Sequence, residues 1–218
     1  MRRAAAWTLI AVLAVYGVLV LGLLALRWIN PLTTSVQVQR RLEALFSRKP
    51  YQKRYDFVPL RRMSPDLQHA VIASEDGRFY THHGFDWVEI QKAIDEDDED
   101  RPLRGASTIT QQLVKNLFLT TGRSFIRKGV EASLVPVAEV ALGKQRILEL
   151  YLNVVEWGPG VFGADAAARF HYGISAAGLS REQAARLAAI LPNPIRRKPA
   201  RMNQKTAIIL ARMRQMGW

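Results

Sequence analysis

The sequence contains no cysteine, and its four histidines, His69, His82, His83 and His171, are not spaced as helical zinc ligands. Without cysteine the chain has no disulfide, no thiol nucleophile and no thiolate metal ligand. The alternation of apolar and polar residues that marks a half-buried strand is almost absent, and neither an internal repeat nor a linker divides the chain. These absences favour a single, mainly α unit without a zinc centre.

Acidic residues are also scarce. The 218 residues include 31 Lys and Arg against 19 Asp and Glu, for a formal net charge of +12, and six of the acids lie together in Asp95–Asp100. The length allows one anchored domain with a sizeable core. Such a basic surface suits nucleic acid, anionic lipid head groups or a phosphate-bearing substrate, and charge alone does not choose among them.

The N-terminal segment helps to choose among these three kinds of partner. Residues 4–26 carry no charge and would form a helix of about 34 Å, enough to cross a hydrocarbon core of about 30 Å. Arg2 and Arg3 precede this run and favour a cytoplasmic N-terminus. No small-x-small cleavage pattern follows before Arg27, so we expect a retained single-pass anchor and not a cleaved signal. A buried core helix is the alternative. An anchor that places the domain outside the cytoplasm argues against a nucleic-acid partner.

Beyond the anchor the chain is expected to be helical. Residues 1–29 are expected to form the cytoplasmic N-terminus and anchor, residues 30–54 a basic helical connection that leaves the membrane, and residues 55–218 the main domain. The acidic run is expected to be a loop. Residues 158–163 match a dinucleotide-binding glycine pattern but follow a helix, so we interpret them as a tight loop between helices. Helices are predicted at residues 64–75, 108–117, 125–143, 144–155, 164–170, 180–191 and 204–216.

The first polar cluster begins at Glu75. This residue follows Leu67 by eight positions and Val71 by four, so it lies on the core-facing side of the predicted helix 64–75. A partly buried carboxylate at a helix end suits a general base. The alternative is a helix-ending carboxylate paired with Arg78, and helical spacing does not decide between the two.

The second cluster is residues 105–116, GASTITQQLVKN. Thr108 and Gln111 have the spacing of a capping box that opens a helix. A helix N-terminus rich in hydroxyls and amides, with Lys115 one turn further on, suits oxyanions or sugar hydroxyls. The alternative is an ordinary capped helix with exposed amides.

The third cluster places Arg127 and Lys128 four and three residues before Glu131, so the three side chains share a helix face. Taken alone, this spacing is typical of a surface ion pair. The fourth cluster, residues 144–153, is an amphipathic helix in which Tyr151 is interpreted as a core residue.

Together the four clusters resemble the peptidoglycan glycosyltransferases, glycosyltransferase family 51. The patterns of that family are E-D-x-x-F-x-x-H-x-G, G-x-S-T-[IL]-[ST]-Q-Q-x-x-K-N, R-K-x-x-E and K-x-x-I-L-x-x-Y-L-N. They occur here in this order, at residues 75–84, 105–116, 127–131 and 144–153. No Ser-x-x-Lys motif is present, so the resemblance is to monofunctional members without a transpeptidase half.

The resemblance implies a lysozyme-like helical fold with a small membrane-proximal lobe, and polymerisation of lipid II into β-1,4-linked strands with inversion and release of undecaprenyl pyrophosphate. Its implied partners are lipid II, undecaprenyl-pyrophosphate-linked glycan, membrane lipid and other cell-wall synthesis and division proteins. Glu75 would be the base, and Glu131 would position cations or hold Mg²⁺ or Mn²⁺. The implied pyrophosphate-binding residues are Lys115, Arg123, Arg127 and Lys128. The implied sugar-site residues are Asp76, His82, Ser107, Thr108, Gln111, Gln112 and Asn116.

Two other functions fit parts of this pattern. A glycan-cleaving lytic transglycosylase or muramidase would share the fold, but it has no pyrophosphate to expel and so no use for the cations around Glu131. An anchored, non-enzymatic scaffold would leave Glu75 and Glu131 without a purpose. The acidic run is a departure from the family, because relatives are often basic or glycine-rich there.

Overall fold

The structure is a computed structural model that describes residues 2–95, 107–122 and 124–218. These ranges contain mainly helix, which confirms the predicted fold class. The α-helices are α1 (Arg2–Ala25), α2 (Ser35–Phe46), α3 (Pro65–Glu75), α4 (Trp87–Asp95), α5 (Ile109–Phe118), α6 (Phe125–Val154), α7 (Ala164–Tyr172), α8 (Arg181–Ile190) and α9 (Asn203–Gln215). Short 3-10 turns are η1 (Leu60–Arg62), η2 (Ala176–Gly178) and η3 (Pro199–Arg201).

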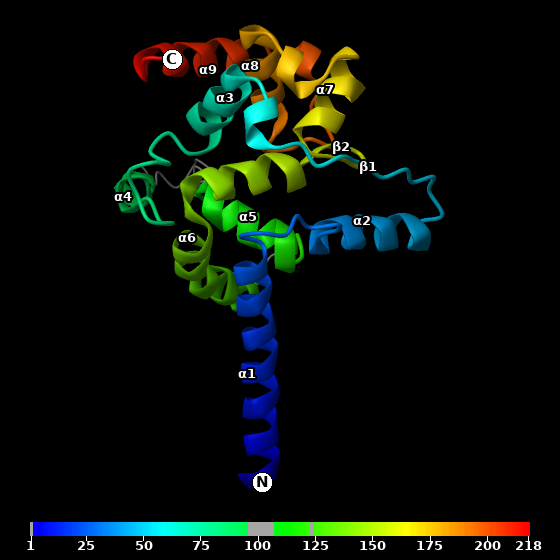
Figure 1. Ribbon diagram of the computed structural model, residues 1–218, viewed down its shortest axis with the longest axis vertical. Helices are drawn as coiled ribbons and strands as arrows, with labels where there is room; N and C mark the ends of the chain where they lie inside the picture. The colour runs from blue at the N-terminus through cyan, green and yellow to red at the C-terminus, as the bar shows by residue number, and fades with distance from the viewer. Residues whose placement is uncertain (1, 96–106, 123) are drawn as a thin grey trace.

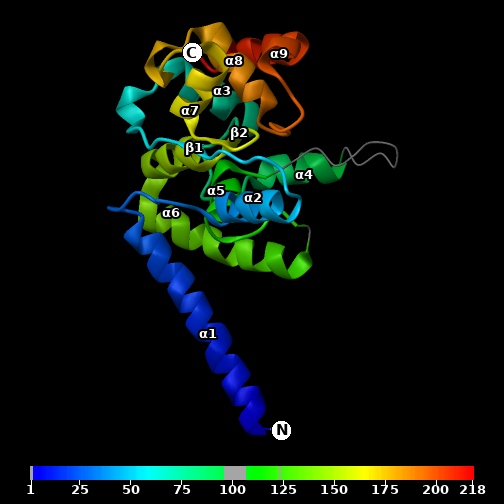
Figure 2. The same cartoon turned by 90° about the vertical axis from the view of Figure 1, so that its right-hand side faces the viewer.

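Helix α1 projects from the rest of the molecule, with the N-terminus at its far end (Figures 1 and 2). In the described part of the chain it is the one helix long and apolar enough to cross a membrane, over Arg3–Ala25. Its last turns pack on the domain: Leu23 is fully buried, and Tyr16 donates a hydrogen bond to the Ser133 carbonyl of α6 at 3.3 Å. Arg146 adds a hydrogen bond to the Leu26 carbonyl at 2.8 Å. The helix is therefore joined firmly to the domain and is not a loose tether.

The other helices form two groups. Helices α2, α5 and the first half of α6 lie near α1, whereas α3, α7, α8 and α9 lie at the opposite end of the molecule (Figures 1 and 2). The core is continuous between them, with fully buried residues such as Leu113 of α5, Leu134 and Leu148 of α6, and Leu67 of α3. Helix α6 turns at Gly143, whose φ of 71° is not helical, as the predicted break between residues 143 and 144 requires.

A small three-stranded sheet, in the order β1-β3-β2, lies between the two groups. Strand β1 (Arg54–Tyr55) is parallel to β3 (Val161–Phe162), which is antiparallel to β2 (Glu156–Gly158). The prediction of a loop at residues 158–163 is therefore wrong, because these residues belong to a hairpin. The strands are two or three residues long and β2 and β3 are buried, so they are too short to show an alternating pattern.

Two further expectations need correction. Residues 30–54 contain the 12-residue helix α2 and the start of the sheet, so the predicted connecting helix is much shorter than expected. Helix α4 was not predicted; it begins after Asp86, whose Oδ1 accepts a hydrogen bond from the Glu89 N–H at 3.1 Å. The boundaries proposed at residues 29 and 54 stay predictions. Residues 96–100 of the acidic run lie outside the described residues.

Candidate active site

Glu75 is the last residue of α3, and its carboxylate is half-buried. Its Oε2 accepts a hydrogen bond from Gln112 Nε2 at 3.1 Å, and its Oε1 accepts one from Ser74 Oγ at 3.1 Å. The alternative pairing with Arg78 is not formed, since Arg78 Nε lies 3.5 Å from Asp86 Oδ2 instead. Among the residues that the structure describes, Glu75 has no ion-pair partner, and these two hydrogen bonds hold its carboxylate in place.

The orientation of Gln112 is set from the core. The hydroxyl of Tyr151, which is fully buried, donates a hydrogen bond to Gln112 Oε1 at 3.0 Å, so the amide NH₂ of Gln112 points to Glu75. Burial raises the pKa of Tyr151 well above its usual value, and the negative charges of Glu75 and Asp76 raise it further. Tyr151 therefore keeps its proton and stays a hydrogen-bond donor to Gln112. From the sequence Tyr151 was interpreted as a core residue, and its hydrogen bond to Gln112 was not predicted. Its place in the Y-L-N part of the fourth motif was the available signal.

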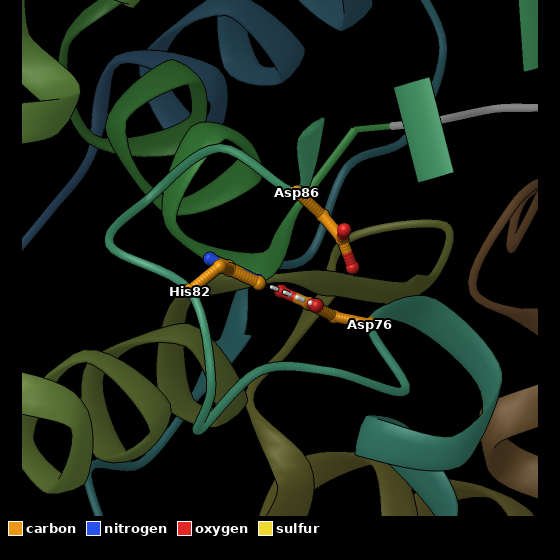
Figure 3. Close-up of side chains that lie close together, drawn as sticks. All are labelled: Asp76, His82 and Asp86. Carbon is orange, nitrogen blue, oxygen red and sulfur yellow. Dashed lines mark hydrogen bonds and ion pairs between the residues drawn. The ribbon is translucent and has the colours of Figure 1, made fainter. Parts of the chain in front are cut away.

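Asp76, the next residue, belongs to a buried polar cluster with His82 and Asp86 (Figure 3). The Gly84 N–H donates to His82 Nδ1 at 3.1 Å, which leaves the ring proton on Nε2 to donate to Asp76 Oδ1 at 2.8 Å. Asp76 Oδ2 accepts a hydrogen bond from the Ile109 N–H at 2.9 Å. Burial raises the pKa of Asp76, and these two hydrogen bonds oppose the rise. The cluster thus fastens the end of α3 to the start of α5.

The ligand atoms of Asp76, His82 and Asp86 lie within 4.8 Å of one another, close enough to share a metal ion. Their hydrogen bonds, however, already explain the arrangement. Asp76 uses both oxygens within the protein, and Asp86 caps α4 through the Glu89 N–H. We therefore interpret the cluster as structural: it holds the end of α3 against the start of α5 and so positions Glu75.

The start of α5 is fixed by the predicted capping box. Thr108 Oγ1 accepts a hydrogen bond from the Gln111 N–H at 3.2 Å, and Gln111 Oε1 accepts one from the Thr108 N–H at 2.9 Å. Thr108 Oγ1 also donates to the Gly84 carbonyl at 2.7 Å. Gly84 has a φ of +95°, and a Cβ there would lie 2.4 Å from Val135 Cγ1, so this position requires glycine.

The predicted sugar-site residues thus differ in placement. Five are buried and hydrogen-bonded within the protein, so they support the site from behind and do not face it: Asp76, His82, Thr108, Gln111 and Asn116. Ser107 and Gln112 are partly exposed and remain candidates for direct contact. A sequence pattern cannot separate these two roles, because both demand the same residue.

Three of the predicted cations gather around Glu131, which is only 2% exposed. Its Oε2 accepts a hydrogen bond from Arg127 at 2.7 Å, and its Oε1 accepts one from Lys128. Burial lowers the pKa of Lys115, while the charges of Glu131 and Glu75 raise it and those of Arg127 and Lys128 lower it. The charge of Lys115 therefore interacts with both carboxylates. Arg123 lies outside the described residues.

These residues fall within a stretch that known proteins share. The family model described as "Transglycosylase" matches residues 41–214. The chain belongs to the transglycosylase family. It is 46% identical over 198 residues to the biosynthetic peptidoglycan transglycosylase of Pseudomonas entomophila (strain L48), covering 89% of this chain and 84% of the relative. It is 48% identical over 202 residues to the protein of that description in Pseudomonas fluorescens (strain SBW25), covering 91% and 84%.

The family resemblance implied that Glu131 either positions cations or holds Mg²⁺ or Mn²⁺. Both carboxylate oxygens of Glu131 are paired with cations, and among the described residues the acidic and histidine side chains close enough to share an ion are those of Asp76, His82 and Asp86. The donor set at Glu131 therefore does not fit a divalent metal. The arrangement supports the other expected role, in which Glu131 positions Arg127 and Lys128. Participation of a metal elsewhere stays a prediction.

Proposed function

We propose that the chain polymerises lipid II into β-1,4-linked glycan strands with inversion and release of undecaprenyl pyrophosphate. One observation carries this proposal: Gln112, which is hydrogen-bonded to Glu75, lies one turn before Lys115 on α5, and the charge of Lys115 interacts with Glu75 and with the ion-paired group at Glu131. A carboxylate without an ion-pair partner is thereby adjacent to a cluster of positive charge. This combination suits a reaction that takes a proton from a hydroxyl and expels a phosphate.

In the proposed reaction Glu75 accepts the proton of the GlcNAc 4-hydroxyl of lipid II as its oxygen attacks C1 of the MurNAc at the end of the growing strand. The bond from C1 to the pyrophosphate oxygen breaks, and its electron pair leaves with the undecaprenyl pyrophosphate. Because attack and departure occur on opposite faces of C1, the configuration inverts.

The departing pyrophosphate gains negative charge, which Lys115, Arg127 and Lys128 are placed to stabilise. Arg127 has a further donor for this task, since its buried Nε has no hydrogen-bond partner in the described part of the chain. A buried donor of this kind is costly unless a ligand satisfies it. A phosphate oxygen would do so, whereas hydrolysis of a finished glycan supplies no such anion.

The alternatives are weaker for the same reason. A lytic transglycosylase or muramidase needs a carboxylate but not the buried cations beside it. A scaffold does not need the two hydrogen bonds that link Tyr151 to Gln112 and Gln112 to Glu75. It also does not need a Glu75 without an ion-pair partner in the described part of the chain. The similar proteins named above are biosynthetic by description, which agrees with synthesis of the strand.

The location that we propose is the inner membrane, crossed once by α1, with the domain on the periplasmic or outer face. From Tyr16 onward α1 packs against the domain. The 13 residues from 3 to 15 rise only about 20 Å, less than the roughly 30 Å of a hydrocarbon core. The start of α6 should therefore enter the membrane as well, and there Phe125 is 97% exposed and Ile126 is 82% exposed. Other cell-wall synthesis and division proteins are proposed partners on this membrane.

This immersion can be measured directly, since the chain has no cysteine of its own. An Ile126→Cys variant carrying a fluorophore and reconstituted in vesicles should be quenched several-fold by lipids brominated on their acyl chains. Ile208, which is 49% exposed on α9 at the opposite end, provides the matched control as Ile208→Cys and should not be quenched. Equal quenching at both positions, or none at 126, would contradict immersion of α6.

The test of the proposed function is incubation of the detergent-solubilised chain with labelled lipid II, with and without Mg²⁺. Long glycan products separated by gel electrophoresis are expected. Unchanged lipid II together with cleavage of purified cell wall would replace the synthetic function with the lytic one. Inactivity in both assays would favour the scaffold.

A further inference from the structure

Lys205 of α9 is a half-buried cation that the proposed reaction does not use. It forms no hydrogen bond or ion pair with any residue that the structure describes. Burial lowers its pKa, the charge of Glu75 raises it, and the charges of Arg197 and Arg212 lower it again. Lys205 lies seven residues before Arg212, on the same face of α9, and Arg212 is hydrogen-bonded to the carbonyl of Ala73, two residues before Glu75. Lys205 therefore belongs to the face of α9 that packs beside the proposed base, in a group of three cations.

The two arginines have structural partners. Arg197 Nη1 donates to the Ala189 carbonyl at the end of α8, and Arg212 Nη1 donates to the Ala73 carbonyl near the end of α3, each at 3.3 Å. Cations are favourable at the negative ends of helices, so these contacts explain why the arginines are there. They do not explain Lys205. The charge of Glu75 offsets part of the repulsion from the two arginines, but Lys205 forms no direct ion pair in the described part of the chain, so its ammonium is able to bind a further anion.

This second cationic group approaches Glu75 from the side away from the membrane. Helix α9 lies at the end of the molecule opposite α1 (Figures 1 and 2). Lys115, by contrast, is one turn before Phe118, whose ring is so close to α1 that a Cβ at Gly22 would lie 3.2 Å from it. The negative charge of Glu75 raises the pKa of both Lys115 and Lys205. The two groups therefore meet different parts of any substrate held at Glu75.

We propose that Lys205, with Arg197 and Arg212, binds the carboxylates of the peptide carried by the muramyl sugar. This inference rests on the proposed function. The pyrophosphate of lipid II is tied to the membrane by its lipid, so it belongs with Lys115 on the membrane side. The other anionic part of the molecule is the peptide on the lactyl group, which is free to extend away from the membrane. Ammonium and guanidinium groups bind carboxylates through charge-assisted hydrogen bonds.

The consequence is a substrate preference. The chain should use lipid II with an acidic peptide better than lipid II whose peptide carboxylates are amidated, and the difference should depend on Lys205. The effect should fall on KM, because the peptide keeps the same charge throughout the reaction and its binding energy is equal in the ground and transition states.

The experiment compares wild type, Lys205→Met and Lys205→Arg in detergent, with both forms of lipid II. Lys205→Met should raise KM about tenfold for the acidic substrate, as expected for the loss of one charge-assisted hydrogen bond. It should leave kcat, and KM for the amidated substrate, unchanged. Lys205→Arg should keep the preference. Lys198→Met, which removes an exposed charge from the same end of the molecule, should behave as wild type.

The outcomes separate the two proposals. If wild type makes glycan from both substrates and Lys205→Met loses equally on both, or on neither, the peptide site is wrong while the proposed function stands. If wild type makes no glycan from either substrate, the proposed function itself fails. A midpoint of thermal unfolding equal to that of wild type would show that Lys205→Met is folded. If Lys205→Met does not fold, Lys205→Arg still tests the site, because loss of the preference for the acidic substrate in this variant would contradict a role that requires only a cation.

Discussion

Replacement of Glu75 by Gln is expected to reduce glycan polymerisation by about 10²–10⁴-fold, the usual contribution of a general base. The substitution keeps the size of the side chain. Its amide oxygen can still accept a hydrogen bond from Gln112, and its NH₂ can donate one to Ser74 Oγ; both residues lie 3.1 Å from the Glu75 carboxylate. It removes only the group that accepts the proton of the attacking hydroxyl. The loss should appear in kcat, measured as the rate of glycan formation from labelled lipid II, with little change in KM.

Glu89→Gln is the matched control. Glu89 lies on the neighbouring α4, its side chain is 50% exposed, and it pairs with Lys92, so the same loss of charge should leave activity within about twofold of wild type. A folded Glu75→Gln variant that retains more than a tenth of wild-type activity would contradict the role of Glu75 as base.

The sequence predicted most of the helices because their boundaries carry local signals. The capping box at Thr108 and Gln111 opens α5 as expected, and a second one at Ser180 and Gln183 opens α8. Such signals depend on residues three positions apart and survive in any fold. The same spacing occurs at Asp86 and Glu89, where α4 begins, but it was not recognised as a helix start. The sheet joins residues 54–55 to residues 161–162, a pairing that no local pattern reveals.

The candidate site was predicted unevenly for a similar reason. Helical spacing placed Arg127, Lys128 and Glu131 on one face, and the structure shows that face to be buried at Glu131. Spacing could not show that Tyr151 reaches Gln112 across 39 positions. It also could not place Lys205, which is 130 positions after Glu75, beside it. Contacts between distant segments arise from packing, and the periodicity of one segment cannot predict them.

Replacement of Lys115 by Met is expected to reduce activity by about 10²–10³-fold, comparable to removal of a donor that stabilises developing charge. Lys115 is partly desolvated, which strengthens its interaction with the leaving pyrophosphate relative to that of an exposed lysine. Methionine preserves most of the length and the apolar contacts of the side chain. The rate of a single turnover with preformed lipid-linked glycan as donor and lipid II as acceptor measures the effect.

Whether the loss of activity falls on kcat or on KM is the sharper test of the role of Lys115. Negative charge on the pyrophosphate increases as the bond to C1 breaks, so Lys115 interacts more strongly with the transition state than with the bound donor. Lys115→Met should therefore lower kcat, whereas Lys205→Met should raise KM. Lys92→Met, at a side chain that is 58% exposed, controls for net charge and should match wild type. A folded Lys115→Met variant with unchanged kcat would assign the departing pyrophosphate to other cations, and Arg127 with its unpartnered Nε would be the next to test.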